Sequence, residues 1–358
     1  MPDKILYIKP ANSTFMITDQ QIMEKNFRVK SFVIAGGKGG IRFIRRIIAM
    51  IFFVINHIRD TKAIVTWFAD YHAAVLVFMG KVFNMKVIII AGGQEAICYP
   101  ELRKGVYLKK FRGNMVKYAL RNASLIIPNH ESLIYHENFF YDPRGKKDGM
   151  KYYIPDLETP IDIVYNGIDP SKFYRDDSIS KEPGAIMTLG TMNTTYDFIN
   201  KGFDLFIDLA RRNPGLHFCL IGINRNFLPW IEKNHPYADL PNLEVVFSFC
   251  THEIIFKNLN KAKVFIQASI TEGMPNTLCE AMLCECIPVG SAVNGIPDVI
   301  GETGIIIKKR NIEALEQAVY QALKFDTGKM AADRIRENFS MGQREKKITE
   351  ILFRELGD

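Results

Sequence analysis

Short runs of β-branched and aliphatic residues alternate with longer amphipathic stretches along the chain. Short apolar runs bounded by turn residues predict strands, and apolar positions three and four apart predict helices. In the first half this pattern predicts strands at Ile5–Ile8, Val29–Ile34, Ala63–Trp67, Lys86–Ile90, Ser124–Ile127 and Ile161–Val164. Helices are predicted at Arg42–Ile58, Tyr71–Phe83 and Leu108–Arg121.

The same rhythm restarts after Asp169. Strands are predicted at Ala185–Leu189, His217–Ile221, Glu244–Phe247, Val264–Gln267, Ile287–Val289 and Ile305–Ile307. Helices are predicted at Gly202–Arg212, Glu253–Asn260, Asn276–Cys284 and Ile312–Phe325. Strands that alternate with helices over both halves predict an α/β protein with two doubly wound, Rossmann-like domains.

A turn-rich cluster, Asn166-Gly167-Ile168-Asp169-Pro170, precedes the polar run Arg175–Gly184 and indicates a linker. We therefore expect an N-terminal domain at 1–170, a second domain at 171–340, and a last helix at 341–358 that crosses back to the first. The segment Tyr135–Tyr153 is expected to be a long exposed loop of the first domain. Because ligands of open α/β sheets bind beyond the carboxyl ends of the strands, the predicted site is a cleft across which the two domains face each other.

Composition narrows the class of protein. The 358 residues are 47% hydrophobic and 24% charged, as in a globular protein of two domains. Residues 1–170 hold 24 Lys and Arg against 15 Asp and Glu, a net charge of +9, whereas the remainder holds 22 against 24, a net charge of −2. The basic half is expected to meet a membrane surface, a phosphate-bearing substrate or nucleic acid.

The cysteines and the first residues of the chain indicate the cellular compartment of the protein. The six cysteines form no CxxC pair, so we expect reduced thiols, as in a cytosolic protein. Met1-Pro2-Asp3-Lys4 leads directly into a strand-like run, which predicts no signal peptide. No cluster of His, Cys and Asp has metal-ligand spacing, so no metal is expected. The sequence predicts a cytoplasmic protein.

The most informative stretch is Ser269–Met282, where a strand ends in a Gly- and Pro-containing loop before a helix. Asn276 is a candidate N-cap of that helix. A helix N-terminus stabilises an anion such as a diphosphate. Glu272 and Glu280 flank the turn, and an ionised carboxylate accepts hydrogen bonds from sugar hydroxyls such as a ribose diol. The alternative is a generic strand, loop and helix with surface glutamates.

This stretch resembles the glutamate pair of the family 4, or group 1, glycosyltransferases with the two-domain fold called GT-B. The resemblance extends to Asn166–Asp169, to Lys201-Gly202-Phe203-Asp204 after Leu189-Gly190, and to Gly295-Ile296-Pro297. The specific part covers residues 164–307. It implies a retaining hexosyltransferase of the EC 2.4 class that uses a nucleotide-diphosphate-sugar as substrate, without a divalent metal or other cofactor.

The resemblance also implies residue roles. Glu280 would hold the ribose hydroxyls, Glu272 would lie against the donor sugar, and Lys201 would neutralise the leaving diphosphate. The backbone N–H groups of the loop would hold sugar hydroxyls and diphosphate. The other donor-binding candidates are Gly190, Thr191, Gly273, Met274, Pro275, Asn276, Thr277 and Phe249. Thr191 stands where the family often has an arginine, and Arg225 is a candidate replacement for that cation.

Two residues of the first half are candidates for orienting the acceptor or the transferred sugar, and so for a catalytic role. His72 and Glu95 both follow predicted strands. The alternative for His72 is a helix-start residue with a structural hydrogen bond. The alternative for Glu95 is a carboxylate that stabilises a helix N-terminus.

Two basic runs interleaved with apolar residues, Ile41–Phe53 and Lys104–Arg121, are typical of helices at an anionic membrane interface. A core helix with a solvated cationic flank is the alternative. Peripheral association with the inner face of a membrane, with a lipid-linked acceptor, is therefore a hypothesis. Gly36-Gly37-Lys38-Gly39-Gly40 matches neither the Walker pattern nor GxGxxG, and we interpret it as a turn.

The leading hypothesis is transfer of a sugar to a glycan or lipid-linked acceptor in cell-surface polysaccharide or glycolipid biosynthesis. A nucleotide-sugar epimerase on the same fold is the alternative enzyme. A nucleic-acid-binding protein is the alternative of another class, although no helix-turn-helix, RNP or zinc-finger spacing supports it, and we expect no nucleic-acid partner.

Overall fold

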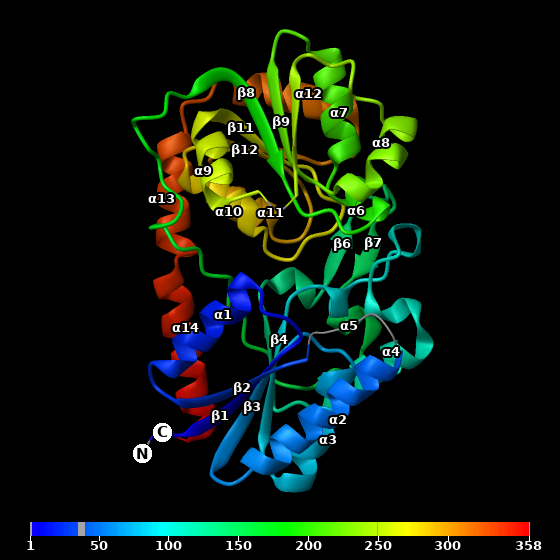
Figure 1. Cartoon of the computed structure of the whole chain (residues 1–358), viewed down its shortest axis with the longest axis vertical. Helices are drawn as coiled ribbons and strands as arrows, with labels where there is room; N and C mark the ends of the chain where they lie inside the picture. Colours follow the sequence, from blue (N-terminus) through cyan, green and yellow to red (C-terminus); the bar gives the residue numbers. More distant parts are fainter. Residues whose placement is uncertain (1, 35–39, 249, 358) are drawn as a thin grey trace. The chain divides into compact units, whose positions relative to one another are not determined.

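The computed structural model describes residues 2–34, 40–248 and 250–357 (Figure 1). The chain divides into two compact units. Unit 1 contains Met1–His136, Asp148–Gly167 and Gly342–Asp358, and unit 2 contains Glu137–Lys147 and Ile168–Met341. Each unit is built around its own parallel sheet, and the segment after Gly342 belongs to unit 1.

Unit 1 holds a five-stranded sheet in the order β2-β1-β3-β4-β5. The strands are β1 (Lys4–Lys9), β2 (Arg28–Val33), β3 (Thr61–Trp67), β4 (Lys86–Ala91) and β5 (Leu125–Pro128). All of these pairs are parallel. The helices are α1 (Thr14–Glu24), α2 (Gly40–His57), α3 (Tyr71–Phe83), α4 (Lys110–Asn122), α5 (Met150–Tyr153) and α14 (Met341–Leu356).

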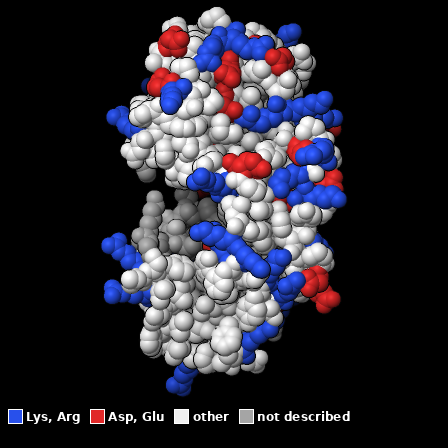
Figure 2. Space-filling view, turned by 90° about the vertical axis from the view of Figure 1, so that its right-hand side faces the viewer, with Lys and Arg blue, Asp and Glu red and all other residues white. Residues whose placement is uncertain are grey.

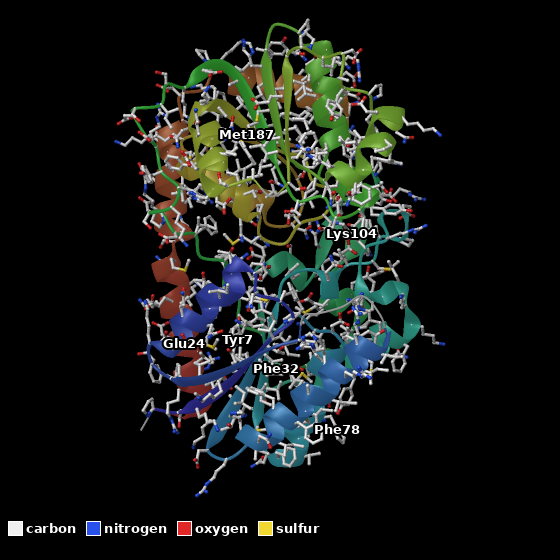
Figure 3. All side chains as sticks on the ribbon, in the orientation of Figure 1. Tyr7, Glu24, Phe32, Phe78, Lys104 and Met187 are labelled. Atoms are coloured by element: carbon white, nitrogen blue, oxygen red, sulfur yellow. The ribbon has the colours of Figure 1, made fainter. Side chains whose placement is uncertain are left out.

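Helices cover both faces of this sheet because its strands are apolar on both sides. Leu6 and Ile8 point to one face, where they join a core cluster with Met50 of α2 and Val77 of α3. Tyr7 alternates to the other face, and its hydroxyl donates to the carbonyl of Met16 in α1 at 3.1 Å (Figure 3). The strands therefore read as nearly continuous hydrophobic runs, as buried parallel strands do.

A buried ion pair ties α14 to the other elements of unit 1. Arg344 and Asp19 are 3% and 1% exposed, and the guanidinium donates to both carboxylate oxygens at 2.7 Å. Arg344 also donates to the carbonyls of Val164 and Tyr165, and Trp67 donates its indole N–H to Asp19 at 2.9 Å. The charges are thus paired and hydrogen-bonded, which a buried ion pair requires.

Unit 2 holds a six-stranded sheet in the order β10-β9-β8-β11-β12-β13. The strands are β8 (Glu182–Leu189), β9 (His217–Ile223), β10 (Leu243–Phe247), β11 (Ala262–Gln267), β12 (Ile287–Ser291) and β13 (Ile305–Ile307). The helices are α6 (Thr195–Asn200), α7 (Phe203–Arg212), α8 (Leu228–Asn234), α9 (His252–Lys261), α10 (Asn276–Leu283), α11 (Ile296–Ile300), α12 (Ile312–Ala322) and α13 (Gly328–Asn338). The strand order reverses between β8 and β11, so a crevice for ligands is expected at their carboxyl ends.

Two predictions about elements were wrong. Ile161–Val164 is not a sixth strand of the first sheet: it forms one isolated bridge, Ile126 with Ile161, and a few backbone hydrogen bonds beside β5. Tyr135–Tyr153 is not a simple loop of the first domain. It contains a two-stranded sheet of β6 (His136–Asn138) and β7 (Lys146–Asp148), and Glu137–Lys147 belongs to unit 2.

Candidate active site

The loop between β11 and α10 is tied to the end of its own strand. Gln267 is buried and lies at the last position of β11. Its side-chain nitrogen donates to the hydroxyl of Ser269 at 2.7 Å, and its oxygen accepts from the hydroxyl of Thr277 at 3.2 Å. One amide therefore fixes both ends of the loop that carries Glu272.

Neighbouring segments hold the same loop from both sides. On the β12 side, Ser291 donates to the carbonyl of Ser269 at 2.7 Å, and Asn294 accepts from the N–H of Glu272 at 3.1 Å. On the α6 side, the N–H of Ile270 donates to the carbonyl of Asn200 at 2.8 Å. Sequence reasoning missed these positioning residues, although polar side chains at buried strand ends, such as Gln267, are the signal that would have found them.

Lys201 and Glu272 form an ion pair, with Nζ 2.6 Å from Oε2. The two side chains are 21% and 20% exposed, so the pair is largely withdrawn from water. Lys201 is the C-cap of α6, and a Cβ on Gly190 would lie 3.3 Å from its side chain. Three of the residues predicted for donor binding are thus brought together at the strand-order reversal of unit 2.

Gly202 allows the α6–α7 turn to approach this pair. Its φ is +73°, and a Cβ there would lie 2.5 Å from the carbonyl oxygen of Ala268. Any other residue would be strained by its backbone conformation and would push the turn away from β11. The backbone conformation and the close approach to β11 therefore explain why a glycine follows Lys201.

Glu280 lies in α10, one turn from its start. Burial raises the pKa of its carboxyl to about 7, because the charged form loses solvation. Its carboxylate makes no hydrogen bond or ion pair with any other residue that the structure describes. A partly buried, unpaired acceptor of this kind is available to a ligand that supplies hydroxyl donors.

The start of α10 differs from the prediction. Asn276 is the first residue of the helix, and Pro275, rather than Asn276, is its N-cap. Pro275 has no N–H and no side-chain acceptor, so it contributes neither to a backbone donor set nor to capping. The N-cap residue makes no side-chain hydrogen bond to the first turn, and the positive dipole end of the helix favours an anion.

The remaining candidates for donor binding differ in their exposure to solvent. Gly273, Met274 and Pro275 are buried, and Asn276 and Thr277 are partly exposed. Thr191 is exposed just after β8, and Phe249 lies outside the described residues. Arg225, the candidate second cation, follows β9, lies 4.4 Å from the ring centre of Phe247, and has no ion-pair partner within the described part of the chain.

His72 is buried at the start of α3, after the N-cap Asp70. Its Nε2 lies 3.0 Å from the carbonyl oxygen of Trp67, which only accepts, so Nε2 carries the proton. Burial lowers the pKa of the ring, which keeps it neutral. This geometry favours the structural alternative, and the catalytic role of His72 stays a prediction.

Glu95 lies beyond β4 in the 3₁₀ helix η1 (Gln94–Ala96) and is fully buried. Its Oε1 accepts from the N–H of Gly92 at 2.8 Å, whereas Oε2 has no hydrogen-bond partner among the described residues. Burial raises the pKa of this carboxyl to about 7. A carboxyl that titrates near neutrality is typical of functional sites, and the role of Glu95 in orienting the acceptor stays a prediction.

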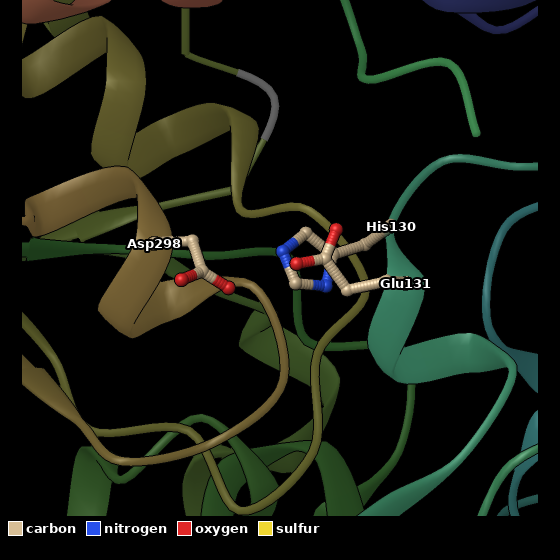
Figure 4. Close-up of side chains that lie close together, drawn as sticks. All are labelled: His130, Glu131 and Asp298. Atoms are coloured by element: carbon tan, nitrogen blue, oxygen red, sulfur yellow. The ribbon is translucent and has the colours of Figure 1, made fainter.

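A second polar group of unit 1 was not singled out from the sequence (Figure 4). His130 is buried and accepts from the N–H of Ser132 through Nδ1 at 3.1 Å. Its ring lies 5.6 Å from that of Tyr165, whose hydroxyl donates to Glu131 at 2.8 Å. Figure 4 also draws Asp298, which belongs to α11 of unit 2. The absence of a metal stays a prediction.

Comparison with known proteins finds a family similarity in unit 2. Residues 184–324 match the family described as glycosyl transferases group 1. This segment of unit 2 is therefore similar to the group 1 glycosyltransferases. The matched segment runs from β8 to the end of α12, and so contains Lys201, Glu272 and Glu280.

The fold is that of the GT-B glycosyltransferases. The structure of sucrose-phosphate synthase from Thermosynechococcus elongatus is similar, with a TM-score of 0.73, 14% identity and 99% of each chain covered. HepE of Anabaena in complex with UDP-glucose has a TM-score of 0.70 and 14% identity, with 98% of this chain and 99% of that chain covered.

A curated relative is one of the subunits of the human phosphatidylinositol N-acetylglucosaminyltransferase. It is 25% identical over 171 residues, 45% of this chain. The chain spans about a third, 34%, of the length of that relative.

Proposed function

We propose that this glycosyltransferase moves a hexose, with retention of configuration, from a nucleotide-diphosphate-sugar to a glycan or lipid-linked acceptor. The acceptor would belong to cell-surface polysaccharide or glycolipid biosynthesis. The observation that carries the proposal is the Lys201–Glu272 pair beside the uncapped start of α10. A cation, a helix N-terminus and carboxylates beyond the carboxyl ends of β8 and β11 fit a diphosphate joined to hydroxyl-rich sugars.

On the donor side, Lys201 and the first-turn N–H groups of α10 would stabilise the charge that develops on the leaving diphosphate. Glu280 would accept hydrogen bonds from the ribose hydroxyls and Glu272 from the transferred sugar. Because Lys201 supplies the positive charge, we propose that transfer needs no divalent metal and continues in the presence of EDTA.

In the chemical step, the bond from the anomeric carbon to the diphosphate oxygen breaks, and a bond to the acceptor oxygen forms on the same face. The acceptor proton passes to the leaving diphosphate. Thr191, Arg225 and the backbone of Gly273–Thr277 would complete donor binding. Glu95 would orient the acceptor. Attack on the same face retains the configuration without a covalent enzyme intermediate.

Known proteins support the donor and acceptor classes. HepE of Anabaena has been solved with UDP, with UDP and glucose, and with UDP-glucose, so a uridine-diphosphate sugar is the first donor to test. The name of the human relative describes transfer to phosphatidylinositol, a lipid. We propose a cytoplasmic protein that works at the inner face of a membrane.

The test is a thermal shift of the full chain with UDP, GDP, ADP, CMP and dTDP and their sugar conjugates. A ligand that binds only the folded state at 100 times its Kd stabilises that state by about 2.7 kcal/mol. We expect one nucleotide to raise Tm, Glu280→Ala to abolish the shift, and the exposed control Glu302→Ala to keep it. A failure of all donors to shift Tm would refute the proposal.

Turnover separates the glycosyltransferase from a nucleotide-sugar epimerase. Glu272→Ala is expected to lower kcat by about 100-fold or more with a smaller change in donor Kd, because it contacts the reacting sugar. Donor incubated without acceptor should be recovered unchanged or slowly hydrolysed. Recovery of an epimerised nucleotide-sugar would favour the alternative enzyme.

A further inference from the structure

Helix α2 carries two apolar faces. Met50 and Val54 form the first and are buried in the core of unit 1. The second is exposed to solvent: Ile41 72%, Ile44 57%, Ile48 47%, Phe52 60% and Ile55 44%. These five positions are three or four residues apart, so they line one side of the helix. A surface helix normally places polar residues there.

The exposed surface continues onto the neighbouring helices. Phe78 and Val82 of α3 are 59% and 58% exposed, and Phe111 of α4 is 70% exposed. Figure 3 shows Phe78 on the outer side of α3. We call these three residues, together with Ile41, Ile44, Ile48, Phe52 and Ile55, the apolar face of unit 1.

Aromatic contacts join the three helices beneath this face. The ring of Tyr71 in α3 lies 5.7 Å from that of Phe43 in α2 and 6.0 Å from that of Phe111 in α4. The three helices are therefore neighbours near their N-terminal ends. Scattered exposed hydrophobic residues are normal, but a continuous patch marks an interaction site.

The charges around this face are positive. Arg42, Arg45 and Arg46 of α2 are exposed and have no ion-pair partner among the residues that the structure describes. Lys109 and Lys110 at the start of α4 are also exposed, and α2 contains no acidic residue. In Figure 2, which shows this side, unit 1 is mostly white, with Lys and Arg around the white surface.

We propose that the apolar face of unit 1 lies in the interface of an anionic lipid bilayer, with Arg42, Arg45 and Arg46 at the headgroups. Each basic residue near such a surface raises the affinity by about fivefold. Among the described residues no helix is long and apolar enough to cross a bilayer, so the contact is made in the plane of the membrane.

Charge argues against a second copy of this chain as the occupant. In a two-fold dimer the same patch meets itself, so the positive charges around it would be brought close to those of the second copy. Like charges across an interface are unfavourable, whereas anionic headgroups complement them. Membrane binding itself does not depend on the proposed function. The inference rests on the proposed function only in one respect, that unit 1 would meet a lipid-linked acceptor at the bilayer.

The experiment is co-sedimentation of the full chain with phosphatidylcholine vesicles that contain either no anionic lipid or about one third phosphatidylglycerol. We expect binding to the anionic vesicles that weakens at high salt. The double variant Ile48→Ser, Phe52→Ser is expected to bind at least about 10-fold more weakly, because two side chains no longer insert. Met330→Ser, which alters an equally exposed residue of unit 2, should bind as the native chain does.

A second measurement reports insertion directly. The variant Phe52→Trp should show a blue-shifted emission component with anionic vesicles, quenched by brominated acyl chains, above the background of Trp67 and Trp230. No vesicle binding at low salt would overturn the inference. A lipid-free dimer that the double variant disrupts would also overturn it. UDP-glucose binding without vesicles tests the proposed function separately, and the double variant should keep it.

Discussion

Two carboxyl groups behave unusually because of where the fold places them. Glu280 and Glu95 belong to different units, and burial raises the pKa of each to about 7. A nearby cation would lower each pKa, and loss of solvation outweighs any such effect in both groups. An ionised carboxylate in such a place lowers the stability of the free protein. The cost is offset when a ligand donates hydrogen bonds to the carboxylate or when a proton binds to it.

The first prediction concerns Glu280 and donor binding. The ionised carboxylate is the better acceptor for ribose hydroxyls, so affinity for UDP-glucose should fall as the pH drops below about 7, by up to about tenfold per pH unit. UDP-glucose has no titrating phosphate in this range, so the slope reports the protein. Calorimetric titration from pH 5.5 to 8.5 measures it. Glu280→Gln should bind weakly at every pH, and a slope retained in that variant would contradict the assignment.

The second prediction concerns Glu95 and stability. Its folded-state pKa of about 7 lies above the ordinary value of 4.5, so the folded state binds more protons between these values. The contribution of Glu95 to the free energy of unfolding therefore falls as the pH rises from 4.5 to 7, and is constant above that. Glu95→Gln should remove this slope and stabilise the chain at pH 8 by up to about 3 kcal/mol.

Denaturant unfolding at pH 5 and pH 8 measures the effect of Glu95→Gln, with the exposed Glu302→Gln as the matched control. Only the Glu95 variant should change the difference between the two pH values. Equal shifts in both variants would show that the carboxyl of Glu95 is solvated.

At the scale of elements, α14 is fastened by buried charge as well as by apolar packing. Arg344 joins α14 to Asp19 of α1 and to the carbonyls of Val164 and Tyr165. A second ion pair of the same helix, Arg354 with Asp162, is exposed. One helix thus offers a buried pair and an exposed pair for direct comparison.

The third prediction compares these pairs. Arg344→Met leaves Asp19 as an unpaired buried charge and should lower the free energy of unfolding by about 3–5 kcal/mol. Arg354→Met should lower it by less than about 1 kcal/mol, because exposed ion pairs contribute little. Denaturant titration of both variants measures the difference. Adding Asp19→Asn to Arg344→Met should restore part of the loss, and no restoration would mean that packing, not charge, dominates.

At the scale of the whole molecule, the proposed donor residues all come from unit 2, whereas Glu95 and the apolar face come from unit 1. The segment matched to the glycosyltransferase family, 184–324, also lies wholly within unit 2. Donor binding and membrane contact are therefore expected to be separable properties.

The fourth prediction follows from that division. Saturating UDP-glucose should slow amide hydrogen exchange most at Gly190–Gly202 and at Ser269–Leu283, by about tenfold or more, because a ligand stabilises the segments that hold it. Exchange in α2 should be unchanged. Mass spectrometry of peptides from the full chain measures both. Protection confined to unit 1 would contradict the donor site.

Much of this arrangement was predictable because it rests on local pattern. The strands of β8 to β13 fall within a few residues of the apolar runs, and Glu272 and Glu280 fall on the expected loop and helix. The predictions of elements and caps that were wrong lie where the surrounding tertiary structure, rather than the local sequence, decides the conformation. Ile161–Val164 has the composition of a strand but pairs along only part of its length. Asn276 has the side chain of an N-cap, yet the bend at Pro275 starts the helix one residue earlier.

By itself the sequence determined the α/β architecture, the resemblance to a glycosyltransferase family, and the residue types of the proposed donor site, since periodicity and motif are properties of neighbours in the chain. Only the tertiary structure brought Lys201 within 2.6 Å of Glu272 across 71 positions of sequence. Burial, which decides the pKa of Glu280 and Glu95, is likewise a property of the whole fold, because it depends on every segment that excludes water. The same holds for the exposed side of α2, whose apolar sequence alone is equally typical of a buried helix.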